Sequence, residues 1–538
     1  MAPNLPFELL SQIAEYLHLD EFPLSQYTIV CRQWQAAFEP FIYSNLIIWS
    51  EEVENMETYM SPQEEYRDLG ELWGMRGHFR YPPLPDWCNG PDQNMRKPKK
   101  ALTLSQLTTM VSGSGSVRRN WICYLKYKIV VPYLLEDWET TKRKRYKYVN
   151  PIRAANDKAF ELAITKLFKV LSNWGDTPRI SLELGLFGLE LGKEPCTEGH
   201  PDAGDYDWDF TNGRTRSVRP YRARFLNDAS VLPNAPCVDQ LRFLNVTRRY
   251  GGNRNHRVWA GTVFDIAVHC PAMTKLELDL DEYVRPDHGD LLIRRRQVVA
   301  DGLTKLPHSL RVFHYKNQQE LNWKQTLPAL NVLPPSGIDS LSINLRDLSF
   351  HLRELKVETT KLSLDFLCPL DDHMKPSSGI SSLDWPRLEI LHFELVQETT
   401  PSGEFLFHYP PDIQAEVDEI DDWEDEICNT ERGHHPRRLM NYDMFHRIFI
   451  SIGYAVQHMP RISHIRFLGE FDREFTFELS RDSFGMFTAM WDNLSYYQPN
   501  EQVASAWKFR VEDMEIIDRG WGEIKSTVKF PIWPPPVP

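Results

Sequence analysis

Residues 263–280, VFDIAVHCPAMTKLELDL, hold one complete unit of the repeat that decides the fold of this chain. The first half has apolar residues at helical spacing and ends near Pro271, because proline cannot continue a helix. In the second half Met273, Leu276 and Leu278 occupy the apolar positions of a short strand. The stretch therefore predicts a helix that is followed directly by a strand.

The strand signal of this unit recurs along the chain as an apolar residue, a second three positions later and a third two positions after that. The copies start at Val238, Met273, Leu310, Ile338, Leu352, Leu388 and Ile462. Intervals of 35, 37 and 36 residues, with one of 74, favour a period near 37, whereas the register around residues 338–357 stays ambiguous. Such a period predicts a repeat architecture.

Helical stretches precede several of these strands and give the unit a second part. Residues 156–178, 291–307 and 444–460 each have a helical pattern that breaks at or near a proline, and a strand signal follows each of them. Alternating helices and parallel strands predict an α/β fold in which neighbouring units stack into a solenoid and bury each other's apolar faces.

The N-terminus carries a different signal, NLPFELLSQIAEYL at residues 4–17, followed by VCRQW at residues 30–34. Pro6 and Glu8 suit the first turn of a helix. A second helix is predicted from Tyr27 to Phe38, with Pro40 ending it. One interpretation is a helical hairpin that packs on the rest of the chain. The other is that a leftover apolar face binds a partner helix, because about forty residues are too few to bury all of it.

These two clusters resemble the F-box, whose pattern begins with Leu-Pro and an acidic residue and continues to a Val-Cys-Arg-x-Trp cluster. The resemblance covers about residues 3–48 and implies binding to the Skp-type adaptor of SCF ubiquitin ligases, and through it to a cullin. The implied adaptor-binding residues are Leu5, Pro6, Glu8, Leu9, Ile13, Tyr16, Leu17, Val30, Cys31 and Trp34. The units of the body resemble irregular leucine-rich repeats, and a body of this kind is found in F-box proteins of fungi.

The resulting domain plan has an F-box at residues 1–48, a linker and loop region at 49–118, and a leucine-rich-repeat-like α/β solenoid at 119–538. Pro-rich and Gly/Ser-rich stretches within residues 82–119 favour the linker. Inserted loops are expected at about 195–222 and 400–438. The closing FPIWPPPVP predicts either polyproline II or a cap on the last repeat.

Composition limits the classes of partner. The chain has 538 residues and a net charge of −14, so binding to nucleic acid over the whole surface is not expected. There is no uninterrupted apolar stretch of 18 residues, which argues against a membrane span. The sequence lacks a secretory signal pattern, and its eight cysteines are scattered, so free thiols and a cytoplasmic or nuclear location are expected.

Several short motifs predict no function. The run DYDWDF at 205–210 lacks the Gly and Glu of a calcium loop, and His434 and His435 beside Cys428 lack a fourth zinc ligand. KRKRYK at 142–147 is either a solvated basic segment or a nuclear signal. The acidic run at 412–426 is expected to be solvated.

The sequence contains none of HExxH, GxSxG, Walker A or GxGxxG, so no catalytic residue, metal or cofactor is predicted. The expected function is therefore not enzymatic. The F-box would bind the adaptor and the repeat body would bind a target protein for ubiquitination; the target-binding residues are not assigned. The alternative is an F-box scaffold protein that binds the adaptor without promoting degradation of a target.

Overall fold

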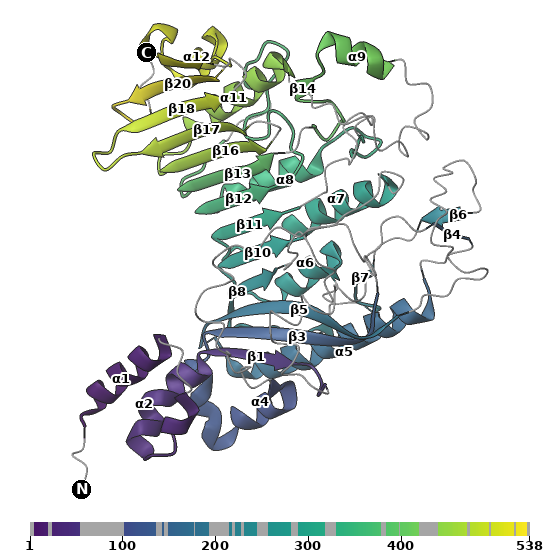
Figure 1. Ribbon diagram of the computed structural model, residues 1–538, viewed down its shortest axis with the longest axis vertical. Helices are drawn as coiled ribbons and strands as arrows, with labels where there is room; N and C mark the ends of the chain where they lie inside the picture. Colours follow the sequence, from purple (N-terminus) through teal and green to yellow (C-terminus); the bar gives the residue numbers. More distant parts are fainter. Residues whose placement is uncertain are drawn as a thin grey trace, which may run out of the picture.

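The computed structural model describes residues 5–19, 24–53, 102–135, 142–144, 149–176, 178–192, 215–217, 221–227, 231–244, 257–280, 289–317, 330–377, 383–396, 399–418, 439–470, 474–493, 497–520 and 523–534. These residues form a mixed α/β fold around one large, mostly parallel sheet (Figure 1). The N-terminal helices lie at one end of this sheet and the C-terminal strands lie at the other.

Parallel strands make up most of the sheet. In the order in which they pair, they are β2 (Leu102–Thr103), β1 (Asn45–Trp49), β3 (Tyr124–Leu134), β5 (Ile180–Leu191), β8 (Val238–Phe243), β10 (Lys275–Asp279), β11 (Val312–Lys316), β12 (Glu354–Glu358), β13 (Ile390–Val396) and β16 (His464–Glu470). Four antiparallel strands continue the sheet, namely β17 (Glu474–Arg481), β18 (Phe487–Asn493), β20 (Glu523–Phe530) and β19 (Glu515–Gly520).

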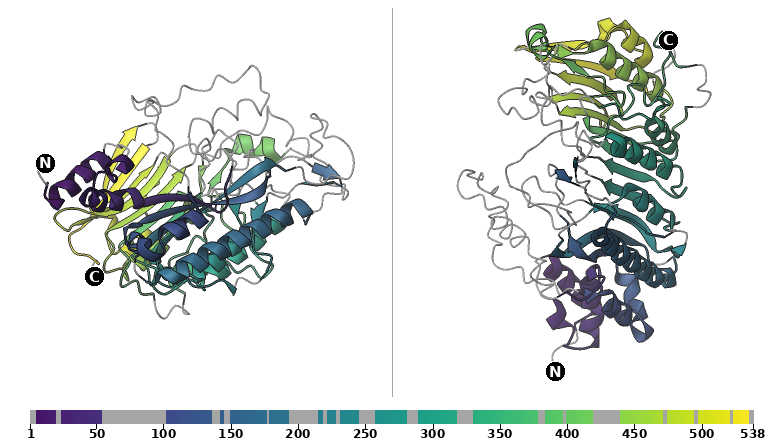
Figure 2. Two further views of the ribbon diagram at one scale, coloured as in Figure 1. Left: turned by 90° about the horizontal axis from the view of Figure 1, so that it is seen from below. Right: turned by 90° about the vertical axis from the view of Figure 1, so that its right-hand side faces the viewer.

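Helices connect the parallel strands and lie on one face of the sheet (Figure 2). They are α5 (Pro151–Leu171), α6 (Ala260–Val268), α7 (Gly289–Leu303), α8 (Ser340–Ser349) and α11 (Tyr442–Val456), and α12 (Glu501–Trp507) packs on α11. Side chains of Asn150, Asp339 and Asn441 cap the N-termini of α5, α8 and α11 by accepting hydrogen bonds from backbone N–H groups. The helix-then-strand order predicted from the sequence is confirmed at these positions.

Shorter elements complete the described chain. They are α1 (Phe7–Leu19), η1 (Leu24–Tyr27), α2 (Arg32–Tyr43), α4 (Leu104–Met110), η5 (Gly113–Trp121), β4 (Lys142–Lys144), η6 (Ser172–Trp174), β6 (Thr215–Ser217), β7 (Arg222–Ala223), β9 (Arg257–Val258), β14 (Phe407–His408), α9 (Pro411–Asp418), β15 (Leu439–Met440) and η9 (Val511–Asp513).

The register of the parallel strands aligns the apolar positions of the repeat and forms one continuous core. One row of aligned, fully buried side chains consists of Leu241, Leu276, Phe313, Leu355, Leu391 and Ile465. Each such side chain contributes roughly 1.5–3 kcal/mol through the burial of apolar surface. Alternate residues of each strand point to the opposite face of the sheet, which the connecting helices do not cover.

Two predictions about the repeat are wrong. The copy at Ile338 is not a strand, because residues 340–349 form α8, which is capped by Asp339. The pattern SLSINLRDL also satisfies helical spacing, and the interval from Leu310 to Leu352 is therefore a single step of 42 residues. The interval of 74 residues contains no further strand of the main sheet in its described part, since β13 pairs directly with β16.

The predicted linker at 49–118 is wrong for its last part. Residues 102–121 form β2, α4 and η5, and a capping box between Thr103 and Gln106 begins α4. Leu104, Leu107 and Val111 enter the main core, which explains why this segment folds despite its Gly and Ser residues. The expected boundary at residue 48 also falls inside β1, whose Ile48 and Trp49 are buried. Residues 54–101 lie outside the described part.

The two predicted inserted loops, at about 195–222 and 400–438, include residues that fold with the body of the protein. At the end of the first, Tyr221 and Arg222 are buried, and Tyr221 donates a hydrogen bond to Asp157 of α5 at 2.8 Å. At the start of the second, Leu406 and Phe407 are buried in the main core, and β14 pairs with β15. Apolar side chains therefore fold the edges of both segments, while residues 193–214 and 419–438 lie outside the described part.

The prediction that Pro40 ends the second helix is wrong. Pro40 lies inside α2, which begins at Arg32 and continues to Tyr43. A proline removes one backbone hydrogen bond, but Phe41 and Ile42 pack against the same apolar cluster as Phe38 and favour continuation of the helix.

The C-terminal segment packs on the sheet, in keeping with the cap interpretation. The Trp533 ring stacks on Phe487, with 4.6 Å between ring centroids, and also contacts Phe530. None of the described helices is long and apolar enough to cross a bilayer. DYDWDF, Cys428, His434 and His435 lie outside the described residues, as does KRKRYK beyond β4.

Candidate functional site

The N-terminal hairpin, formed by residues 5–19 and 24–43, has a small core of its own. Helices α1 and α2 and the turn η1 bury Leu10, Ala14, Leu24, Ala37 and Phe38 in a cluster separate from the core of the sheet. The Trp34 ring stacks on Tyr27 and on Phe38, with centroids 6.0 and 5.2 Å apart. The sequence folds this way because its apolar residues recur at helical spacing on both helices.

The residues predicted to bind the adaptor divide into two groups. The exposed ones are Leu5, Pro6, Glu8, Leu9, Tyr16, Val30 and Cys31. The remaining three, Ile13, Leu17 and Trp34, are partly buried against the core of the hairpin. These three side chains therefore stabilise the hairpin itself, and only part of each is open to a partner.

Exposed apolar side chains are concentrated on the hairpin. Of the 21 large apolar residues that are exposed in the described chain, six lie within residues 5–30. Leu9 is 45% exposed and Tyr16 is 67% exposed, and seven residues place them two turns apart on one face of α1. The others in this group are Leu5, Phe7, Ile29 and Val30. Apolar exposure at this density is typical of interaction surfaces.

The sequence prediction missed Phe7 and Ile29. Ile29 is 85% exposed, the highest value in the hairpin, and precedes Val30 in the loop between η1 and α2. The available signal was its position: two adjacent β-branched apolar residues in a loop are unusual, because loops between helices are normally polar.

A joint of three side chains, Glu39, Arg118 and Tyr43, attaches the hairpin to the sheet body, and Trp121 packs against it. Arg118 of η5 donates a hydrogen bond to Glu39 of α2 at 2.8 Å and lies over the Tyr43 ring. Tyr43 in turn stacks on Trp121. Burial raises the pKa of Tyr43, and the carboxylate of Glu39 holds the guanidinium of Arg118 in its charged form. The joint thus holds the hairpin at the β1 end of the sheet.

A row of charged and His side chains crosses the uncovered face of the sheet. This charged row consists of Lys126, Glu183, Arg242, Glu277, His314, Lys356, His392 and Arg466, at aligned positions on β3, β5, β8, β10, β11, β12, β13 and β16. Cross-strand ion pairs join Lys126 to Glu183 at 2.7 Å and Arg242 to Glu277. Such pairs contribute roughly 0.2–1 kcal/mol each and favour the observed register.

His314 and His392 lie in the middle of the charged row. His314 contacts Glu354 at 2.6 Å and Glu277 at 3.4 Å. The contact between His314 and Glu277 is the main reason that the pKa of Glu277 lies well below its usual range. Burial, and then the nearby His464, lower the pKa of His392. The row is consequently a polar, partly buried surface whose ion pairs also involve Glu354 and Glu394 beside it.

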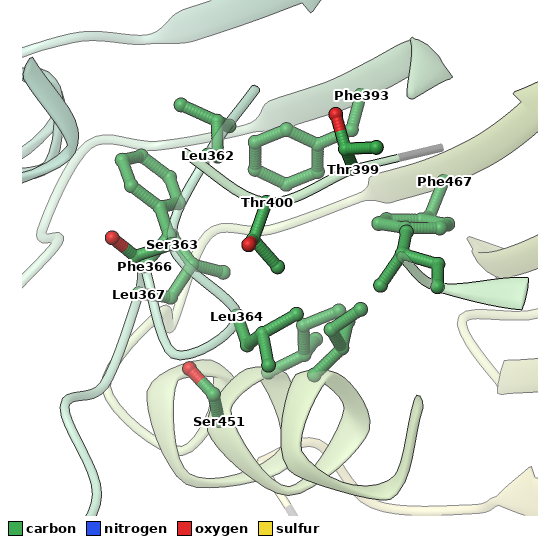
Figure 3. A pocket seen from close by; sticks show the side chains of 13 residues that line it. Leu362, Ser363, Leu364, Phe366, Leu367, Phe393, Thr399, Thr400, Ser451 and Phe467 are labelled. Carbon is green, nitrogen blue, oxygen red and sulfur yellow. The ribbon is translucent and has the colours of Figure 1, made fainter. Parts of the chain in front are cut away.

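An apolar cavity lies at the carboxyl ends of β13 and β16 (Figure 3). Phe393 and Phe467 come from these strands, Phe366 comes from the segment after β12, and Ile448 and Ile452 come from α11. The empty volume is about 520 Å³ including the open mouth. In open α/β sheets this end of the strands is where ligands bind.

Three of the four hydroxyl groups that line this cavity, those of Ser363, Thr400 and Ser451, make hydrogen bonds within the chain. Ser451 accepts a hydrogen bond from the backbone N–H of Cys368 at 2.9 Å, and Thr400 accepts one from Glu404 at 3.0 Å. Its described lining consists of Leu, Ile, Phe, Ser and Thr side chains. The cavity therefore suits an apolar group better than a charged one.

Comparison of the chain with models of protein families, with curated proteins and with solved structures found no match. A search of the described residues for clustered His, Cys, Asp and Glu side chains that could hold a metal ion also found none. The five cysteines in the described part, Cys31, Cys123, Cys237, Cys270 and Cys368, are free thiols.

Proposed function

We propose that this protein is an F-box substrate receptor of an SCF-type ubiquitin ligase. The N-terminal hairpin would bind a Skp-type adaptor, and the sheet body, a leucine-rich-repeat-like α/β solenoid, would bind the target protein. The observation that carries the proposal is the concentration of exposed apolar residues on the hairpin, at positions that match the F-box pattern.

Physical reasoning supports an apolar protein partner for this surface. The core of the hairpin consists of only five buried residues, and Leu9, Tyr16 and Val30 remain exposed. Apolar and aromatic side chains of this kind supply most of the binding energy at protein interfaces. A partner helix that covered Leu9 and Tyr16 would remove this surface from water, which is the mode by which amphipathic helices associate.

A receptor of this kind would act by proximity and would carry out no bond chemistry itself. The hairpin and the C-terminal strands lie at opposite ends of the sheet, so adaptor and target could bind at the same time (Figure 1). Holding a target lysine near the charged ubiquitin-conjugating enzyme raises its effective concentration. The joint of Glu39, Arg118 and Tyr43 would fix the distance between the two binding surfaces.

Two features of the body fit a surface for a protein target. The charged row offers polar contacts over eight neighbouring strands, and the apolar cavity could take a single apolar side chain of the target. The two features lie on opposite faces of the sheet, because Phe393 and Phe467 alternate with His392 and Arg466 along β13 and β16, so each is a separate candidate for the target surface. The strands β8 to β16, which carry most of the charged row and the cavity, lie beyond the hairpin along the sheet (Figure 1).

The proposal is tested by affinity purification of the full-length chain from cells, followed by mass spectrometry. A variant with Leu9→Ala and Tyr16→Ala should lose the adaptor and the cullin but keep other bound proteins. Both side chains are exposed, so the hairpin should remain folded. A matched control is Phe484→Ala, which removes an aromatic ring that is 92% exposed on the turn between β17 and β18. Recovery of the adaptor with the double variant would contradict the proposed surface.

The stability of the other bound proteins in cells then distinguishes ligase from scaffold. If the protein promotes degradation, a chase after translation is stopped should show longer half-lives for these proteins in cells that carry the double variant. Unchanged half-lives, with the adaptor still bound by the original protein, would support the scaffold instead.

A further inference from the structure

A second pocket lies between α7 and α8, where β11 and β12 end. Its polar lining consists of Arg295 and Arg296 from α7, Tyr315 and Asn317 at the end of β11, and Lys361 after β12. Its empty volume is about 360 Å³ including the mouth. Three of these residues are cationic, which is unusual for a pocket in a chain with a net charge of −14.

The carboxylate nearest to this pocket is already fully engaged. Asp339, which caps α8, accepts two hydrogen bonds from the guanidinium of Arg296, at 3.0 and 2.6 Å. Its other oxygen accepts hydrogen bonds from the hydroxyls of Ser342 and Ser363. Asp339 therefore balances the charge of Arg296 and not that of Lys361.

The ammonium of Lys361 has no carboxylate within ion-pair distance in the described part of the chain. Burial, and then the positive charge of Arg296, lower its pKa to about 8. Lys361 is half-buried, and a partly buried cation beside another cation is unfavourable unless an opposite charge accompanies it. Groups held in this state are concentrated at binding and catalytic sites.

The backbone that presents Lys361 is strained. Thr359, two residues earlier, has φ of +52°, a conformation that β-branched residues rarely adopt. Its hydroxyl is buried and makes no hydrogen bond with the described residues. Strain of this kind costs about 1–3 kcal/mol and is concentrated at functional sites. Strain in the backbone and an uncompensated charge thus coincide at the carboxyl ends of parallel strands, where ligands bind in α/β folds.

We infer that this pocket binds the oxyanion of a small molecule, a carboxylate or a phosphate group, with Lys361 as the main contact. Arg295 lines the same pocket, and its side chain is held in place by hydrogen bonds to the carbonyl of Leu280 and to Asn317. Leu292, Val332 and Leu341 line the pocket as well and would contact the apolar part of the ligand. This site is independent of the proposed adaptor and target surfaces.

The test is isothermal titration of the full-length protein at pH 7 with inorganic phosphate and, separately, with butyrate, at ionic strength kept constant with chloride. Thermal unfolding under the same conditions provides a second readout. We expect saturable binding of at least one anion and a melting temperature that rises with its concentration. Binding of phosphate alone indicates a phosphate ester as ligand, and binding of butyrate alone indicates a carboxylate.

Two variants make the assignment specific. Lys361→Met should weaken binding about tenfold or more, because it removes a charge-assisted hydrogen bond. It should not lower the melting temperature without anion, since it also removes a poorly solvated charge. Lys305→Met, at an exposed position just after α7, is the matched control and should bind as the original protein does. Absence of saturable binding by both anions, or equal binding by the two variants, would overturn the inference.

Discussion

The N-terminal hairpin and the sheet body bury their apolar residues in different ways. The hairpin has a separate core of five buried residues and leaves Leu9, Tyr16 and Ile29 exposed. The body has one continuous core, in which each strand aligns its apolar side chains with those of the next, as Leu276 does with Phe313. The small hairpin cannot bury all its apolar side chains by itself, whereas the strands and helices of the extended sheet bury those of their neighbours. The difference predicts that the two regions respond differently to the same substitution.

The largest effect is expected in the body. Phe313 is fully buried in the middle of the sheet, so Phe313→Ala should lower the free energy of unfolding by about 3–5 kcal/mol. Urea unfolding followed by circular dichroism measures this change, with Phe484→Ala as the exposed control. A change below about 1 kcal/mol would mean that the core of the body is not continuous at β11.

Phe38→Ala makes the same change in the hairpin, but its effect should stay local. Phe38 is fully buried, yet it contacts only the hairpin cluster, so its loss should unfold α1 and α2 and leave the main transition of the body unchanged. Amide hydrogen exchange should increase in α1 and α2 and not in β10–β12. The control is Tyr16→Ala, which truncates an exposed ring of the same hairpin. Unfolding of the body by Phe38→Ala would show that the two cores are coupled.

The joint between the two regions should contribute less. Arg118→Met leaves the buried Glu39 without its ion-pair partner and should weaken the attachment of the hairpin by about 1 kcal/mol. Hydrogen exchange in α2 and η5 reports this change. Arg179→Met breaks a more exposed pair with Asp239 and should have no measurable effect on the hairpin. Equal effects of the two variants would show that the joint is not the point of attachment.

The smallest effect is the pH dependence of the charged row. Because burial lowers the pKa of His392, the unfolded chain binds a proton there more readily than the folded one. Stability should therefore fall as the pH drops below about 6.5 and through the lower pKa of the folded state. His392→Gln should reduce this loss between pH 7.5 and 5.5, and the exposed His351→Gln should not. A loss that stays the same in the His392→Gln protein would assign it to other groups.

The sequence predicted most of the sheet because its buried positions repeat. The triplets that start at Met273, Leu352 and Leu388 all lie at strands, since one apolar face per strand enforces their spacing. The triplet that starts at Ile338 was wrongly predicted to be a strand, because its apolar spacing fits a helix as well. Asp339 caps the N-terminus of the helix that forms there and so favours the helix over the strand. The antiparallel strands β17 to β20 were not predicted, because they follow no period of the repeat.

The sites were harder to predict than the fold. The resemblance pointed to Leu9 and Tyr16, but it could not separate them from Trp34, because exposure depends on how α1 and α2 pack. The charged row joins residues such as Glu183 and Arg242 whose neighbourhood depends on strand order. Lys361 carried no signal, since only the fold places it beside Arg296 with no carboxylate of its own.

The most direct test of the proposed function is the affinity of the purified full-length chain for a purified Skp-type adaptor, measured by titration. We expect saturable binding with one adaptor per chain, a loss of about tenfold or more with Leu9→Ala and Tyr16→Ala together, and unchanged affinity with Phe484→Ala. No binding by the original chain, or equal binding by all three proteins, would contradict the account.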